Sequence, residues 1–223
     1  MSEGAREPYR ALLIDYGGVL TTSMSMSFAA FCVAEGVSPE RLKDVLAAAY
    51  STAEDAGVPA NDVHDLVAAV ETGRIRPEEF DRRLAAALSY GLPEPVQPAN
   101  LTSRLFEQLR PDERMRGVVA LARKHGLKTG LISNTWGMTP PEDTSGLFDV
   151  VVLSGREGVR KPQPEIYLLA AERVGIRASA CVFVDDMPAN VEGARRVDMT
   201  GVLHRDPAIT IPRLEELFGL VLS

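Results

Sequence analysis

The sequence has few of the residues that mark specialised classes of protein. It contains two cysteines, three histidines and one tryptophan in 223 residues, and aromatic residues make up 6% of the chain. Cys32 and Cys181 lie far apart, each within an apolar stretch. We therefore expect two buried thiols rather than a disulfide or a metal pair. The histidines share no spacing, which favours surface or core positions over metal binding.

Positive charge and long apolar runs are also scarce. Lysine and arginine number 24 against 31 aspartates and glutamates, so the net charge is −7, which disfavours nucleic acid as a partner. Apolar runs stay well below the ~18 residues that suggest a membrane span, and the polar start over residues 1–9 is unlike a signal peptide. We therefore expect a cytoplasmic protein that binds neither nucleic acid nor membrane. Its oligomeric state, monomer or homodimer, stays open.

The composition, 45% hydrophobic and 25% charged, is typical of a folded chain with one core or one core plus a small accessory domain. Short apolar runs rich in leucine and β-branched residues predict buried parallel strands. Helical patterns separate the last four of these runs. Strands that alternate with helices predict an α/β fold with a Rossmann-like open parallel sheet of five or more strands. The predicted strands are residues 10–15, 128–133, 149–154, 181–185 and 200–204.

Residues 24–97 break this alternation. Apolar residues at helical spacing end at Gly73 and at Gly91, and Ser38 followed by proline opens an earlier helix. Several consecutive helices are too many for one crossover, so we predict a helical insertion rather than helices that simply cover the sheet. The predicted domains are an α/β core over 1–22 and 98–223 and a helical insertion over 23–97.

Polar residues follow three predicted strands where they end: Asp15, Ser133, and the pair Asp185 and Asp186. Lys161 lies in a loop just before a helix. Each residue alone could cap a helix. In an open α/β sheet, however, the carboxyl ends of the strands form the ligand-binding edge. Together these residues predict two carboxylate sites, a hydroxyl and an ammonium group at one edge of the sheet.

The charges of this group indicate its chemistry. The carboxylates of Asp15, Asp185 and Asp186 would repel one another unless a cation or a proton relieved them. Mg²⁺ suits such a site because it takes a few carboxylate or carbonyl oxygens and binds substrate phosphate. Asp15 could form an aspartyl-phosphate, and Lys161 and Ser133 could hold the phosphoryl oxygens.

Four segments, in this order, resemble the haloacid dehalogenase-like (HAD) hydrolase superfamily. The resemblance covers the chain apart from a loosely matched helical segment, and it extends to the subclass with a helical cap inserted after the first strand. It implies a Mg²⁺-dependent phosphatase that acts on a small phosphorylated metabolite. The segments are LLIDYGGVL at 12–20, LISNTWG at 131–137, RKPQPEIY at 160–167 and FVDDMPANVEGA at 183–194.

The resemblance also implies roles for individual residues. Asp15 would be the nucleophile and a Mg²⁺ ligand, the Gly17 carbonyl a second ligand, and Asp186 the acidic ligand of the fourth segment. Asp185 would be a further ligand or a base beside it. Ser133 and the backbone N–H of Asn134 would bind the phosphate. Lys161 would neutralise the charge of the nucleophile and of the transferred group, and Asn190 would orient the acidic loop.

Gly17 departs from the pattern, because phosphatases of this superfamily usually carry a general acid–base aspartate at that position. Such a loss commonly costs ~10²–10⁴-fold in rate, which favours substrates with good leaving groups. A binding or regulatory protein that kept the phosphate pocket but lost catalysis is therefore an alternative. A 2-haloacid dehalogenase is a third reading, which the acidic pair Asp185–Asp186 disfavours.

Six other residues have two readings each. Trp136, Met24, Met26 and Phe28 could line the cleft or pack in the core. Arg156 and Arg160 are expected to be solvated loop charges, with a phosphate contact as the alternative.

Overall fold

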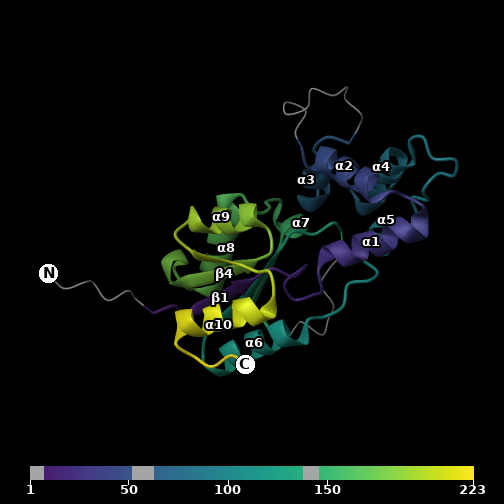
Figure 1. Cartoon of the computed structure of the whole chain (residues 1–223). Helices are drawn as coiled ribbons and strands as arrows, with labels where there is room; N and C mark the ends of the chain where they lie inside the picture. Colours follow the sequence, from purple (N-terminus) through teal and green to yellow (C-terminus); the bar gives the residue numbers. More distant parts are fainter. Residues whose placement is uncertain (1–7, 52–62, 138–145) are drawn as a thin grey trace.

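The computed structural model describes residues 8–51, 63–137 and 146–223, and its centre is a five-stranded parallel sheet (Figure 1). The strand order is β3-β2-β1-β4-β5, and β1 pairs through Leu13 with Gly130 on one side and with Phe183 on the other. The sheet confirms the predicted α/β class and all five predicted strands. Their bounds are β1 Ala11–Ile14, β2 Lys128–Ser133, β3 Val150–Leu153, β4 Cys181–Asp185 and β5 Thr200–Leu203.

Helices cover both faces of the sheet. Helices α6 (Glu113–Lys124) and α10 (Pro207–Phe218) lie on one face, and α8 (Pro164–Val174) and α9 (Pro188–Arg195) lie on the other (Figure 1). Side chains of β1 alternate between the two layers: Leu12 and Ile14 face one, Ala11 and Leu13 the other. Burial on both faces explains why the strands are continuous apolar runs.

The described helices between β1 and α6 form a group of their own beside the sheet (Figure 1). They share an apolar cluster that includes Phe31, Leu66, Phe80 and Leu88, which confirms a helical cap after the first strand. Residues Leu101 and Leu105, beyond the predicted range 23–97, also pack into this cluster. The predicted domain boundaries stay a prediction. The bounds are α1 Met24–Glu35, α2 Pro39–Tyr50, α3 Leu66–Glu71, α4 Pro77–Ser89 and α5 Leu101–Leu105.

Two short helical turns complete the described elements. Helix α7 (Ser154–Glu157) follows β3 and contacts α3 of the cap, and the 3₁₀ turn η2 (Ala178–Ala180) leads into β4. Cys32 and Cys181 are buried and unbonded to each other, as predicted. Of the helices in the described ranges, none combines the length and apolarity that crossing a bilayer requires.

Candidate active site

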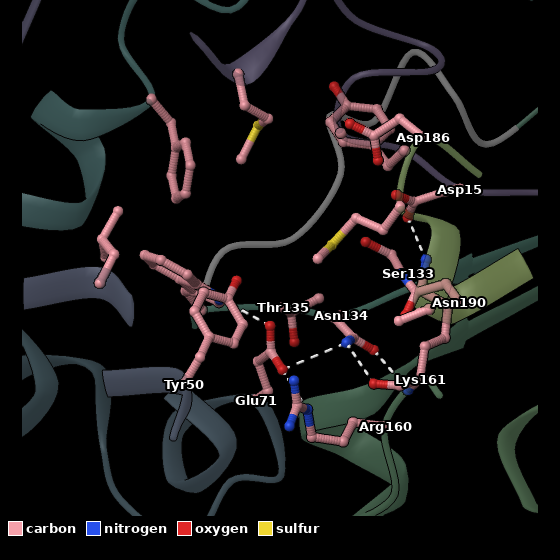
Figure 2. Close-up of a pocket in the computed structure, with 18 of the residues that line it drawn as sticks. Asp15, Tyr50, Glu71, Ser133, Asn134, Thr135, Arg160, Lys161, Asp186 and Asn190 are labelled. Carbon is pink, nitrogen blue, oxygen red and sulfur yellow. Dashed lines mark hydrogen bonds and ion pairs between the residues drawn. The ribbon is translucent and has the colours of Figure 1, made fainter. Parts of the chain in front are cut away.

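A cavity of about 710 Å³ opens where β1, β2 and β4 end, between the sheet and the cap. Residues from both parts line it: Asp15, Gly17, Ser133 and Lys161 belong to the α/β core, and Phe28 belongs to the cap. Figure 2 shows Asp15, Ser133 and Asp186 gathered at one end of the cavity, with Tyr50 and Glu71 at the other. The sequence argument from strand ends thus leads to one site.

Asp15 and Lys161 form the centre of the polar end. Lys161 Nζ lies 2.6 Å from Asp15 Oδ1 and 2.7 Å from Asp185 Oδ2, and the lysine side chain is only 1% exposed. Burial raises the pKa of Asp15 to about 7; Lys161 opposes this shift, and Asp185 adds to it. The same two carboxylates hold the pKa of Lys161 above its ordinary value although burial alone would lower it. Lys161 is therefore a fixed cation.

Asp185 is fully buried and does not line the cavity. Besides Lys161 Nζ, its carboxylate accepts hydrogen bonds from Asn190 Nδ2 at 3.0 and 3.1 Å and from the Met187 backbone N–H at 2.8 Å. Both oxygens therefore have donors within the protein. This arrangement fixes Lys161 and the first turn of α9 relative to β4. Asn190 therefore contacts the acidic loop, and its orienting role stays a prediction.

Asp186 does line the cavity, beside Asp15. One carboxylate oxygen from each of Asp15, Asp185 and Asp186 lies within 4.8 Å of the others. Burial, followed by the charge of Asp185, raises the pKa of Asp186 to about 6. Desolvated carboxylates this close are unfavourable without a counter-charge, and oxygen ligands of this kind are those that Mg²⁺ takes. The donor set fits a divalent cation.

The two glycines after Asp15 differ in the room around them. Gly18 has a φ of +73°, and a Cβ there would lie 2.4 Å from Asp186 Oδ2, so the position requires glycine. A Cβ on Gly17 would meet only Met24 Sδ at 3.4 Å and Met24 Cε at 4.0 Å, which is ordinary contact. The absence of an acid–base side chain at Gly17 is therefore not imposed by lack of space.

Ser133 and Asn134, at the end of β2, both line the cavity. The Asn134 side chain has a role that the sequence did not indicate. Its Oδ1 accepts the Lys161 backbone N–H at 2.9 Å, and its Nδ2 donates to the Lys161 carbonyl at 3.1 Å. Asn134 thus holds the backbone of the lysine whose ammonium contacts Asp15. The phosphate-binding roles of Ser133 and the Asn134 N–H stay predictions.

Glu71, at the end of α3, is a functional candidate that sequence analysis missed. It is 2% exposed and forms an ion pair with Arg160. It also accepts hydrogen bonds from Trp136 Nε1 at 2.9 Å and from Asn134 Nδ2 at 3.3 Å. Figure 2 shows this contact between cap and core beside Lys161. The expectation that Arg160 is a solvated loop charge is wrong, because its partner Glu71 is buried.

Of the other undecided residues, Trp136 and Phe28 meet both of their readings, and Met24 meets the first. Met26 and Arg156 are exposed and do not line the cavity. Trp136 lines the cavity and also belongs to the apolar cluster of the cap, where its ring centroid lies 5.1 Å from that of Phe80. Phe28 and Met24 line the cavity, and Phe28 packs against the same cluster. No signal in the sequence separates a wall of the cavity from a core position when one side chain serves as both.

Comparison with known proteins identifies the family of the chain. The sequence profile described as a haloacid dehalogenase-like hydrolase matches residues 9–198. A mouse protein, acyl-CoA dehydrogenase family member 10, is 27% identical over 96% of this chain and 20% of its own length. Phosphatase MT3486 of Mycobacterium tuberculosis is 34% identical over 60% of this chain and 63% of its own length. The match to the rat bifunctional epoxide hydrolase 2 covers 27% of that protein. This chain therefore spans only 20–63% of the length of these three relatives.

Solved structures share the fold. The HAD family enzyme BT-2542 of Bacteroides thetaiotaomicron superposes with a TM-score of 0.61 at 19% identity, over 89% of this chain and 95% of that one. A second structure of that enzyme, in complex with magnesium and inorganic phosphate, gives a TM-score of 0.58 at 20% identity, over 88% and 94%. The profile match spans most of the chain, so the protein belongs to the haloacid dehalogenase-like hydrolases and carries a helical cap after its first strand.

Proposed function

We propose that the protein is a Mg²⁺-dependent phosphatase of a small phosphorylated metabolite, with Asp15 as the nucleophile. The observation that carries the proposal is the placement of the Asp15 carboxylate at the end of the cavity, 2.6 Å from a buried ammonium and within 4.8 Å of two further carboxylates. A nucleophile and fixed positive charge in one desolvated pocket are what phosphoryl transfer requires.

The residues divide the work as follows. An Asp15 oxygen attacks phosphorus, and the bond from phosphorus to the leaving oxygen breaks, which forms an aspartyl-phosphate and releases the alcohol after proton uptake from water. Water then attacks phosphorus, the bond to Asp15 breaks, and inorganic phosphate leaves. Lys161 holds the Asp15 carboxylate in place and offsets the negative charge of the phosphoryl oxygens, while Ser133 and the backbone N–H of Asn134 donate to those oxygens.

The carboxylates of Asp15 and Asp186 and the Gly17 carbonyl would hold the cation, which supplies positive charge to the phosphate when it is bound. Asp185 is proposed to act through Lys161 and Asn190, because its two oxygens already accept four hydrogen bonds. The proposed positioning role of Asp185 thus differs from both expected roles, a further ligand or a base.

Relatives support the reaction class but differ in substrate. Besides Phosphatase MT3486, they include sesquiterpene phosphatase astK of Aspergillus oryzae, 29% identical over 67% of this chain and 77% of its own length. Another is the glyceraldehyde 3-phosphate phosphatase of Methanopyrus kandleri, which is 30% identical over 59% of this chain and 60% of its own length. The names agree on phosphate ester hydrolysis, so this is the chemistry carried over.

Phosphate release from 4-nitrophenyl phosphate, with Mg²⁺ or with EDTA, tests the proposal. We expect turnover with Mg²⁺, its loss with EDTA and its loss in Asp15→Asn, whereas Asp44→Asn, at an exposed position of the cap, keeps full activity. The second candidate is a non-catalytic phosphate-binding protein, which the absence of an acid–base side chain at Gly17 favours. Calorimetry with inorganic phosphate, combined with the activity assay, distinguishes it from a phosphatase. Phosphate binding with Mg²⁺ but no turnover of any phosphate ester would support that candidate. Halide release from a 2-haloacid without Mg²⁺ would support a dehalogenase instead.

A further inference from the structure

The cavity is apolar along the wall that leads away from Asp15. Four aromatic side chains form a continuous row, hereafter the aromatic row, made of Phe28, Phe106, Trp136 and Tyr50. Their ring centroids are 5.9 Å apart for Phe28 and Phe106, 5.3 Å for Phe106 and Trp136, and 6.3 Å for Trp136 and Tyr50. All four line the cavity, as do Met24, Leu46 and Leu109.

The cations of the same lining are already paired within the protein. In the described part of the chain, the cations that line the cavity are Arg160, which pairs with Glu71, and Lys161, which pairs with Asp15 and Asp185. The side-chain amide of Asn190 donates to Asp185, and that of Asn134 holds Lys161. Ser103, Ser133, Thr135 and Asp186 also line the cavity. Along the aromatic row, however, a sugar or polyol would bury hydroxyl groups against ring faces, which is costly without hydrogen-bond partners.

We propose that the substrate is an apolar phosphomonoester, an aryl phosphate with an alkyl substituent, whose phosphate lies at Asp15 and whose apolar part lies along the aromatic row. This inference rests on the proposed phosphatase function and names its substrate class. Gly17 supports it independently, because a phenol is a better leaving group than an alkanol and needs a general acid less. Aromatic rings in the wall also favour a ring in the substrate through stacked or edge-on contacts.

The expected selectivity follows from the burial of hydrocarbon. Each methylene moved from water into an apolar pocket raises affinity about fourfold. From 4-methylphenyl to 4-butylphenyl phosphate, three methylenes are added while the acidity of the leaving phenol stays nearly constant. We therefore expect kcat/KM to rise roughly 60-fold over this series, and to fall when the alkyl chain is replaced by a glycol ether of equal length.

Variants of Phe28 test the place of binding. Phe28 is half-buried and lies on α1, so its replacement leaves the sheet untouched. Phe28→Asn should flatten the dependence on chain length, whereas Phe28→Leu should keep most of it. Val33→Asn is the matched control, because Val33 lies on the same helix, is 86% exposed and does not line the cavity.

A binding measurement separates this inference from the proposed function. Calorimetry with non-hydrolysable 4-alkylphenyl phosphonates, in the presence of Mg²⁺, measures the affinity of the pocket whether or not the protein hydrolyses phosphate esters. If no aryl phosphate is hydrolysed but phosphonate affinity rises with chain length, the phosphatase proposal fails and the apolar site stands. If kcat/KM and phosphonate affinity are both independent of chain length, or if the glycol ether is preferred, the apolar substrate class is overturned while hydrolysis itself still supports a phosphatase.

Discussion

Gly17→Asp is the substitution that most directly tests the chemistry of this site. The residue lies two positions after Asp15 and lines the cavity, and its φ is not among the positive values of the described glycines, so an aspartate can adopt its backbone conformation. The new Cβ would meet Met24 Sδ at 3.4 Å. Methionine is flexible enough to adjust, and we expect the variant to fold normally.

The gain should depend on the leaving group. A positioned general acid contributes about 10²–10⁴-fold, equal to roughly 3–5 kcal/mol of barrier. Butyl phosphate, whose alkoxide leaves poorly, should therefore be hydrolysed at least about 100-fold faster by Gly17→Asp than by the natural protein. For 4-nitrophenyl phosphate, whose leaving group needs no proton, the gain should stay below about tenfold.

The assay is phosphate release from both esters at saturating Mg²⁺. Gly17→Asn controls for shape, since an amide fills the same space without donating a proton to the leaving oxygen. Gly18→Asp controls for position, and it should inactivate the protein because a Cβ at Gly18 lies 2.4 Å from Asp186 Oδ2. Equal gains for both esters, or a gain in Gly17→Asn as large as in Gly17→Asp, would refute the argument that an absent acid limits the reaction.

Three further predictions concern the charges around the cavity. Burial raises the pKa of Glu71, so the folded state binds more protons than the unfolded state above the ordinary pKa of a glutamate. The stability of the protein relative to Glu71→Gln should therefore fall as the pH rises from about 4.5 to about 8. Thermal melts of both proteins over this pH range measure the difference, and a relative stability that increases with pH would contradict the prediction. Lys161→Met leaves two buried carboxylates without their cation and should cost about 3–5 kcal/mol in urea unfolding, whereas Lys124→Met, at an exposed position of α6, should change it by less than about 0.5 kcal/mol. Mg²⁺ should raise the melting temperature of the natural protein, and EDTA should reverse this; an equal increase in Asp186→Asn would argue against Asp186 as a ligand.

The sheet and the residues at its edge were predictable because their signals are local. A strand buried on both faces is a run of apolar residues, and the polar residue that ends it stands next to it in the sequence, as Asp185 does after β4. Because all strands are parallel, their carboxyl ends meet at one edge. Lys161 was a candidate from its loop just before a helix, and the role expected of it came from the resemblance of four ordered segments to one superfamily.

Two helices, α1 and α10, were not predicted from the sequence, for different reasons. Helix α1 reads MSMSFAAFCVAE, and its buried positions are Ser27, Phe31 and Cys32. The Ser27 hydroxyl donates to the Leu105 carbonyl at 2.8 Å, so a polar residue occupies an inward-facing position. Helix α10 contains Pro212, which ordinarily indicates the end of a helix. In α1 a tertiary hydrogen bond of Ser27 interrupts the apolar pattern, and α10 continues through a proline that local rules read as a helix end.

Glu71 shows most clearly what local patterns omit. A glutamate near the end of a short helix is ordinarily solvated, and its partners Asn134, Trp136 and Arg160 lie 63 to 89 residues further along the chain. Glu71 becomes buried because the cap packs against the core, a contact that the local sequence around Glu71 does not reveal. The same Asn134 amide that donates to Glu71 also holds the backbone of Lys161, and Lys161 contacts Asp15. The Asn134 side chain therefore joins the position of the cap to the cation beside the proposed nucleophile, and a change in the cap at Glu71 can reach Asp15 through three consecutive contacts.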